Sequence, residues 1–109
     1  MPRPHRLEFP GITLHVVQRG NNRQPCFFRE RDYYFYVETL GELLDQFACQ
    51  LHAYVLMTNH VHLMLTPSQA GTVSRVMQSL GRRYVAYVNA SRERTGTLWE
   101  GRFKSCPVD

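Results

Sequence analysis

The amino-acid sequence predicts an α+β domain in which four β-strands and two helices follow one another in the order β-α-β-β-α-β. Four short stretches are rich in β-branched and aromatic residues, and two longer stretches carry apolar residues at helical spacing. The length of 109 residues is enough for one hydrophobic core and too short for two. We therefore expect a single domain spanning residues 1–109.

The first half of the chain contains one strand and one helix. A basic, proline-containing arm over residues 1–11 ends in a Pro-Gly turn, and its composition is compatible with either a frayed terminus or a phosphate contact. The first strand is predicted at residues 12–18. A turn rich in Gly, Asn and Arg follows at residues 19–23, and residues 29–47 then show the apolar periodicity of an amphipathic helix.

The second strand is predicted at residues 49–56 and the third at residues 60–66. Only three residues separate them, a length that favours an antiparallel hairpin. The strongest helical periodicity in the chain begins at Thr72 and continues to Val88.

The fourth strand is predicted at residues 97–105, with Gly101 as a bulge or a place of close backbone approach. The complete order of elements is that of the ferredoxin-like fold, a four-stranded antiparallel sheet with two helices on one face.

The charge composition favours a nucleic-acid partner. The formal net charge is +4, the isoelectric point is about 9.3, and twelve arginines accompany a single lysine. Arginine suits bidentate contacts with phosphates and base edges, so nucleic acid is the first expectation and an acidic membrane surface the second. A basic surface without such a partner is the alternative.

Other classes of protein are disfavoured. Three widely spaced cysteines with no CxxC pair predict neither a disulfide framework nor a zinc knuckle. No apolar run approaches membrane-spanning length and no signal region follows the N-terminus, so we expect a cytoplasmic, reduced protein without a membrane partner.

His60 and His62 are the candidate metal ligands. On a strand they point to the same face, roughly 6.6 Å apart along the backbone, while Val61, Leu63 and Leu65 point to the other face, which is expected to be the core side. Two such imidazoles can reach one divalent ion or serve as a general base. Two strand histidines with a purely structural role are the alternative at this stage.

Candidate nucleic-acid contacts are the basic and amide residues that lie off the predicted apolar stripes. A solvated basic face is the alternative for each of them. The set comprises Arg19, Asn21 and Asn22 in the first turn, Arg82 and Arg83 on the second helix, and Arg102 and Lys104 in the last strand.

Four ordered motifs together resemble one known family. They are Tyr54-Val55-Leu56-Met57-Thr58-Asn59-His60-Val61-His62-Leu63, Phe9-Pro10-Gly11 leading into His15-Val16-Val17-Gln18-Arg19-Gly20-Asn21, Arg82-Arg83-Tyr84, and Gly96-Thr97-Leu98-Trp99-Glu100-Gly101-Arg102-Phe103-Lys104-Ser105. In this combination the chain resembles, over nearly its whole length, the IS200-like single-tyrosine transposases, and most closely the REP-associated tyrosine transposases.

The resemblance implies a ferredoxin-like fold and cleavage and rejoining of single-stranded DNA next to imperfect hairpins. It implies Mg²⁺ or Mn²⁺ held by His60 and His62, polarising the scissile phosphate. It also implies a tyrosine nucleophile that forms a 5′-phosphotyrosyl intermediate, and a homodimer that binds the hairpin through basic surfaces.

The sequence departs from the family pattern at its end. In the family, the nucleophilic tyrosine and a third, polar metal ligand lie on a helix after the fourth strand. We therefore expect the nucleophile to follow Asp109, and no catalytic tyrosine within this chain. Tyr84 and Tyr87 lie on the apolar stripe of the second helix and are expected in the core, while Tyr54 borders the second strand with no evident base.

Three hypotheses of function follow. The first is a metal-dependent transposase, and the second is a catalytically inactive nucleic-acid-binding remnant or regulator that uses the same basic residues. The third, which the basic charge disfavours, is a ferredoxin-like interaction domain with no nucleic-acid partner. Cleavage of hairpin DNA separates the first from the second. Without the helix that covers part of the sheet in the family, an exposed patch is expected that could drive dimerisation.

Overall fold

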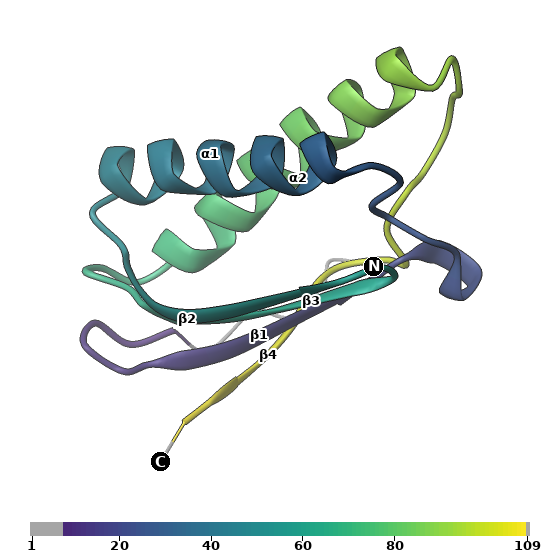
Figure 1. Cartoon of the computed structure of the whole chain (residues 1–109). Coiled ribbons are helices and arrows are strands. Elements are labelled where there is room, and N and C mark those ends of the chain that lie inside the picture. The colour runs from purple at the N-terminus through teal and green to yellow at the C-terminus, as the bar shows by residue number, and fades with distance from the viewer. Residues whose placement is uncertain (1–7, 109) are drawn as a thin grey trace.

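The computed structural model describes residues 8–108 and shows a four-stranded sheet with two helices on one face (Figure 1). Residues 1–7 of the predicted basic arm lie outside the described residues. Within residues 8–108, no helix is long and apolar enough to cross a membrane. The elements are β1 (Leu14–Arg19), the short 3₁₀-helix η1 (Asn21–Arg23), α1 (Glu30–Gln46), β2 (Gln50–Met57), β3 (His60–Thr66), α2 (Thr72–Ser91) and β4 (Lys104–Pro107).

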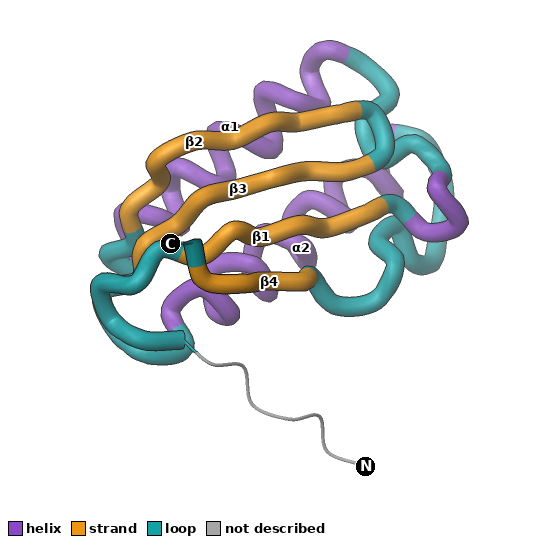
Figure 2. Tube along the Cα trace, turned by 90° about the horizontal axis from the view of Figure 1, so that it is seen from below, coloured by secondary structure: helices purple, strands orange, loops and turns teal. Residues whose placement is uncertain are grey.

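The strand order is β2-β3-β1-β4, and every neighbouring pair is antiparallel (Figure 2). Strands β1 and β2, which α1 connects, are therefore parallel to each other with β3 inserted between them. The same relation holds for β3 and β4, which α2 connects and β1 separates. These two split βαβ units confirm the predicted ferredoxin-like fold.

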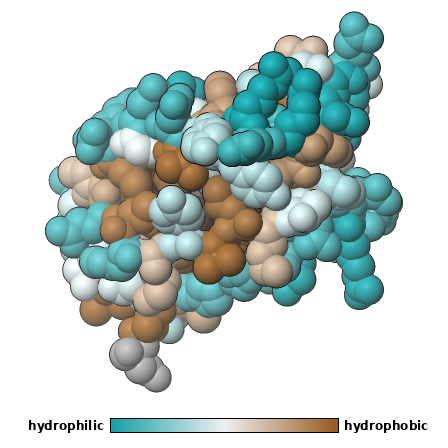
Figure 3. Space-filling view, viewed as in Figure 1, coloured by the Kyte–Doolittle hydropathy of each residue, from teal (hydrophilic) through white to brown (hydrophobic). Residues whose placement is uncertain are grey.

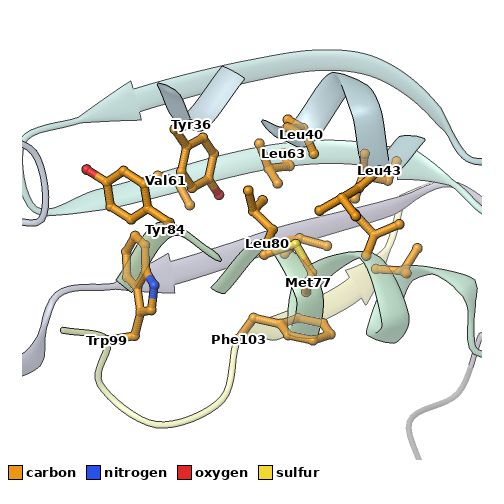
Figure 4. Close-up of a cluster of buried hydrophobic side chains, with 14 of the residues drawn as sticks. Tyr36, Leu40, Leu43, Val61, Leu63, Met77, Leu80, Tyr84, Trp99 and Phe103 are labelled. Carbon is orange, nitrogen blue, oxygen red and sulfur yellow. The ribbon is translucent and has the colours of Figure 1, made fainter. Parts of the chain in front are cut away.

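The core lies between the sheet and the helices (Figure 4). Alternate residues of the two central strands supply its floor: Leu14 and Val16 of β1, and Val61, Leu63 and Leu65 of β3, all at most 2% exposed. Apolar side chains seen from the side gather between the helices and the sheet, and hydrophilic ones cover the helices (Figure 3). The opposite face of the sheet has no helix over it in the part of the chain that the structure describes (Figure 2). We call it the open face.

The predicted fourth strand at residues 97–105 is wrong in its position, because β4 begins only at Lys104. Leu98 and Trp99 are adjacent, and both are buried, which a strand with alternating side chains does not allow. The chain keeps its direction along β1, because Trp99 bridges Gly20 and Lys104 pairs with Val17, but two extra residues bulge out between these pairs. Within this bulge Gly101 adopts a φ of +62°, a conformation that glycine accepts easily. Trp99 and Phe103 consequently both reach the core, beneath the helices (Figure 4).

Asp32 joins the start of α1 to α2. Its carboxylate accepts hydrogen bonds from the backbone N–H groups of Phe28 and Arg29, at 2.8 and 2.9 Å, and from the Tyr87 hydroxyl at 2.7 Å. Burial by itself raises the pKa of Asp32, but these hydrogen bonds and the Arg29 charge outweigh it, and the pKa lies below its ordinary value.

We predict that Asp32→Ala lowers the free energy of unfolding at pH 7 by about 2 kcal/mol, because hydrogen bonds to a buried carboxylate are lost. The pKa of Asp32 is lower in the folded state than its value of 3.8 in the unfolded chain. Ionised Asp32 therefore stabilises the fold at pH values above 3.8, and this contribution is lost as the pH falls through the folded pKa. The difference between variant and wild type should therefore shrink below pH 4 in urea unfolding series. An equal difference at pH 7 and pH 2.5 would contradict this role.

Gly20 lies where three segments meet. Its N–H donates to the Asn59 carbonyl in the β2–β3 turn at 2.8 Å, and its backbone forms an isolated bridge with Trp99. A Cβ atom at this position would collide with the carbonyl oxygen of Gln24. Any residue can adopt the Gly20 φ of −65°, so backbone conformation does not require glycine here. The requirement comes from the close approach of the neighbouring backbone.

We predict that Gly20→Ala destabilises the protein by about 1–3 kcal/mol through this collision. Gly41 lies within α1, and a Cβ atom added there would meet nothing within 4 Å, so Gly41→Ala is the matched control. That substitution should stabilise the protein by about 0.5–1 kcal/mol because it removes a flexible residue from a helix. Both values follow from urea denaturation, and a Gly20→Ala variant as stable as the wild type would refute the close approach.

Candidate metal and nucleic-acid site

Strand alternation places the two predicted metal ligands on the open face. Val61 and Leu63 are fully buried under the helices, while His60 and His62 are partly exposed on the other side. The register pairs Val17 of β1 with His62 and Arg19 with His60. The predicted orientation of the histidines away from the core is thereby confirmed, and Figure 2 views the sheet from this side.

A third histidine joins the pair. His15 of β1 lies with its Nε2 atom 3.0 Å from Nδ1 of His62, and the two rings are nearly parallel and lie edge to edge, with centroids 5.2 Å apart. His60 and His62 have ring centroids 4.9 Å apart in an edge-to-face arrangement. The Nδ1 atom of His60 lies 2.8 Å from Oδ1 of Asn59. Sequence reasoning did not select His15 or Asn59, because the alignment of β1 with β3 is not visible in a single sequence.

The residues present offer two imidazole nitrogens, which fit a weakly held divalent ion. Within residues 8–108, no group of three or more His, Cys, Asp and Glu side chains is arranged to hold a metal. Two imidazoles without a carboxylate supply only part of a coordination sphere, and water or phosphate oxygens would take the other positions of an octahedral ion.

The pKa of the His62 imidazole lies below its ordinary value of 6.5. Burial is the largest cause, and the positive charges of His60, His15 and Arg19 act in the same direction. The ring therefore stays neutral at neutral pH, as a metal-binding imidazole must.

We predict that His62 titrates with a midpoint below 6.5 in an NMR pH titration of the metal-free protein. Because the folded state holds this proton less tightly than the unfolded chain, the free energy of unfolding should fall as the pH drops below 6.5 through the folded pKa. Arg19→Gln removes one positive charge and should raise the midpoint. A midpoint at or above 6.5 in the wild type would contradict the described environment.

A cationic pocket lies next to the histidines. Its volume is about 550 Å³ and its lining comprises Val17, Arg19, Arg23, Asn59, His60, Glu100, Arg102 and Lys104. The lining thus contains four cationic side chains and one carboxylate, that of Glu100, and all five charged side chains are exposed to solvent. In water such side chains attract and hold phosphate groups, and arginine does so with two parallel hydrogen bonds. We call this feature the cationic pocket.

Backbone hydrogen bonds assemble the pocket from distant parts of the chain. The Glu100 N–H donates to the Arg19 carbonyl at 2.8 Å, and the Asn21 N–H donates to the Leu98 carbonyl at 2.9 Å. These bonds hold the 97–103 loop against the end of β1, so Arg102 and Lys104 lie near Arg19. Residues 97–103 thus contribute to the site as a loop rather than as a strand.

The structure separates the predicted nucleic-acid contacts into two groups. Arg19, Arg102 and Lys104 come together in the cationic pocket, and Asn21 and Asn22 lie in η1 beside it without lining it. Arg82 and Arg83 lie on α2, on the other side of the sheet from His60 and His62, and Arg83 forms a 2.8 Å ion pair with Glu42 of α1. Sequence reasoning missed Arg23 and Glu100, although Arg23 lies in the turn already singled out for its charge.

None of the six tyrosines, all within residues 8–108, shares the open face with the histidines. Tyr54 stands opposite Leu63 in the β2–β3 register and so belongs to the helix-facing side of the sheet. Tyr84 is fully buried, as predicted, and its hydroxyl donates to the Cys26 carbonyl. Those on the helices are Tyr33, Tyr34, Tyr36, Tyr84 and Tyr87.

The sequence matches the family described as "Transposase IS200 like" over residues 8–109. The match covers nearly the whole chain, and the protein belongs to this family. No curated protein is detectably similar in sequence.

Two solved structures share the fold. A REP-associated tyrosine transposase bound to a REP hairpin has a TM-score of 0.78 and 14% sequence identity, covering 100% of this chain and 63% of that one. A protein from Deinococcus radiodurans R1 assigned as a transposase has a TM-score of 0.71 and 19% identity, covering 99% of this chain and 87% of that one. The chain therefore spans less than two thirds of the length of the REP-associated protein.

Proposed function

We propose that the protein acts in DNA transposition, binding single-stranded DNA that folds into hairpins. The observation that carries the proposal is the position of His60 and His62 on the open face, with His60 at the wall of the cationic pocket. A site for a divalent ion beside a site for phosphates is what cleavage of a phosphodiester requires. Membership of the IS200-like family supports this choice of reaction.

The chemistry of the pocket favours a nucleic-acid backbone over a small anion. Its four cations come from η1, β1, the 97–103 loop and β4, so they can contact more than one phosphate. The similarity of the fold to a hairpin-bound REP-associated transposase supports hairpin DNA as the substrate class.

In the complete reaction, His60 and His62 would hold Mg²⁺ or Mn²⁺, which polarises the scissile phosphate when bound. A tyrosine phenol would attack the phosphorus, forming a 5′-phosphotyrosyl bond while the bond from phosphorus to the 3′ oxygen breaks. The proton lost by the phenol balances the 3′-hydroxyl that is released, and attack by a 3′-hydroxyl reverses the step during rejoining. Arg19, Arg102 and Lys104 neutralise the phosphates and hold the strand.

A second candidate is a catalytically inactive binding protein or regulator. It is favoured by one observation: the open face carries no tyrosine among the described residues. We propose that the nucleophile of the complete reaction is none of the six tyrosines in residues 8–108, so this chain alone binds hairpins without forming an adduct. A homodimer also stays a prediction, and the exposed Val55 and Met57 of edge strand β2 offer an apolar surface for it.

Binding can be tested by fluorescence anisotropy with a hairpin-containing single strand and an unrelated duplex. We expect tighter binding to the hairpin strand and a steep loss of affinity with salt. Lys104→Ala should weaken binding and lower the slope of log affinity against log salt by about 0.7–0.9, because one phosphate contact is lost. Arg82→Ala, on the far side of the sheet, is the matched control.

Hairpin DNA binding no tighter than duplex would overturn the proposed substrate. An Arg82→Ala loss as large as that of Lys104→Ala would show that the cationic pocket is not the principal contact.

Formation of a covalent phosphotyrosyl adduct can be tested by incubating the protein with labelled hairpin DNA and Mn²⁺ and running a denaturing protein gel. We expect bound DNA but no covalent adduct. An adduct would establish the enzymatic reaction and would contradict the assignment of all six tyrosines to non-catalytic roles.

A further inference from the structure

We infer that His15 and Asn59 are positioning residues for the two metal-binding histidines. Each accepts a hydrogen bond from the Nδ1–H group of one ligand, which leaves Nε2 of His62 and of His60 as the free donor atoms for the ion. The inference deepens the proposed function and rests on its assignment of His60 and His62 as ligands.

The pairing of Asn59 with His60 fixes the position of one proton. In this orientation of the Asn59 amide, its Oδ1 atom is a carbonyl oxygen that can only accept, so the 2.8 Å contact assigns the proton to Nδ1 of His60. In a neutral imidazole the other nitrogen then holds an available lone pair. His60 is therefore prepared to bind a metal through Nε2.

The pairing of His15 with His62 has two possible arrangements. If Nε2–H of His15 donates to Nδ1 of His62, 3.0 Å away, the His62 proton lies on Nε2 and neither of its nitrogens is available to a metal. If Nδ1–H of His62 donates instead, Nε2 is free. Only the second arrangement is compatible with His62 as a ligand, and it repeats the arrangement at His60.

The surroundings of His62 also fix the orientation of its ring. The rings of His15 and His62 lie edge to edge with an interplanar angle of 11°, and His60 meets His62 edge to face at 78°. The His62 ring is thus held on one side by β1 and on the other by its own strand. Partners that hold the second nitrogen of a ligating histidine orient the ring and raise its basicity, and their loss typically weakens metal binding by about 10–100-fold.

The first test determines which ring nitrogen of each histidine carries the proton, by ¹⁵N NMR of the metal-free protein. We expect His60 and His62 to carry their protons on Nδ1. In His15→Phe, which keeps an aromatic ring beside His62 without a nitrogen acceptor, the His62 proton should move to Nε2. A His62 ring protonated on Nε2 in the wild type would overturn the inference whether or not the protein binds a metal.

The second test measures Mn²⁺ affinity by electron paramagnetic resonance. His15→Phe should bind Mn²⁺ about 10–100-fold more weakly than the wild type. His15→Gln, whose amide oxygen can accept the same hydrogen bond, should recover most of the affinity. His52→Phe is the matched control, because His52 also hydrogen-bonds across the sheet, to Thr66, but lies outside the histidine cluster.

Equal losses in His15→Phe and His15→Gln would overturn the positioning role, since a retained acceptor would then make no difference. Unchanged Mn²⁺ affinity in His62→Ala would instead show that the metal assignment of the proposed function is wrong. The two failures are therefore distinguishable.

Discussion

The antiparallel pairing of β1 with β3 is the interaction on which the rest of the structure depends. On the helix-facing side, this pairing brings the fully buried Val16 and Leu63 into opposition at the centre of the core. On the open face, the same register places Arg19 beside His60 and brings His15 within hydrogen-bonding distance of His62. Because the side-chain period of a strand is two, a shift of one residue would exchange the core and the site.

The two faces of the sheet differ in composition: one forms the hydrophobic core and the other carries the polar and charged residues of the candidate site. The helix-facing side is apolar and closed by α1 and α2, while the open face concentrates imidazoles and cations that no helix covers within residues 8–108. Gly20 links the two sides of the sheet, because its backbone connects the end of β1 to the β2–β3 turn and to the loop that carries Arg102. We therefore expect a substitution at Gly20 to disturb both the fold and the cationic pocket.

Local patterns in the sequence were sufficient for the helices and for the orientation of β3, because apolar spacing at 3.6 and 2 residues reflects burial directly. The same reasoning misplaced the fourth strand, since burial of both Leu98 and Trp99 depends on the bulge around Gly101 and on the space beneath the helices. It found His60 and His62, which are close in sequence, but not His15, whose proximity depends on pairing between distant strands. The pocket likewise joins Arg23 to Lys104 only after folding.

The central claim is that His60 and His62 hold a divalent ion at the place where DNA phosphates bind. The most direct measurement is pulsed electron paramagnetic resonance of the protein loaded with Mn²⁺ and hairpin DNA, which detects the nuclei coupled to the ion. We expect coupling to imidazole nitrogens that is lost in the His60→Ala, His62→Ala double variant, together with coupling to phosphorus of the DNA. Coupling to phosphorus alone, unchanged in the double variant, would show that the ion belongs to the DNA and would contradict the metal site.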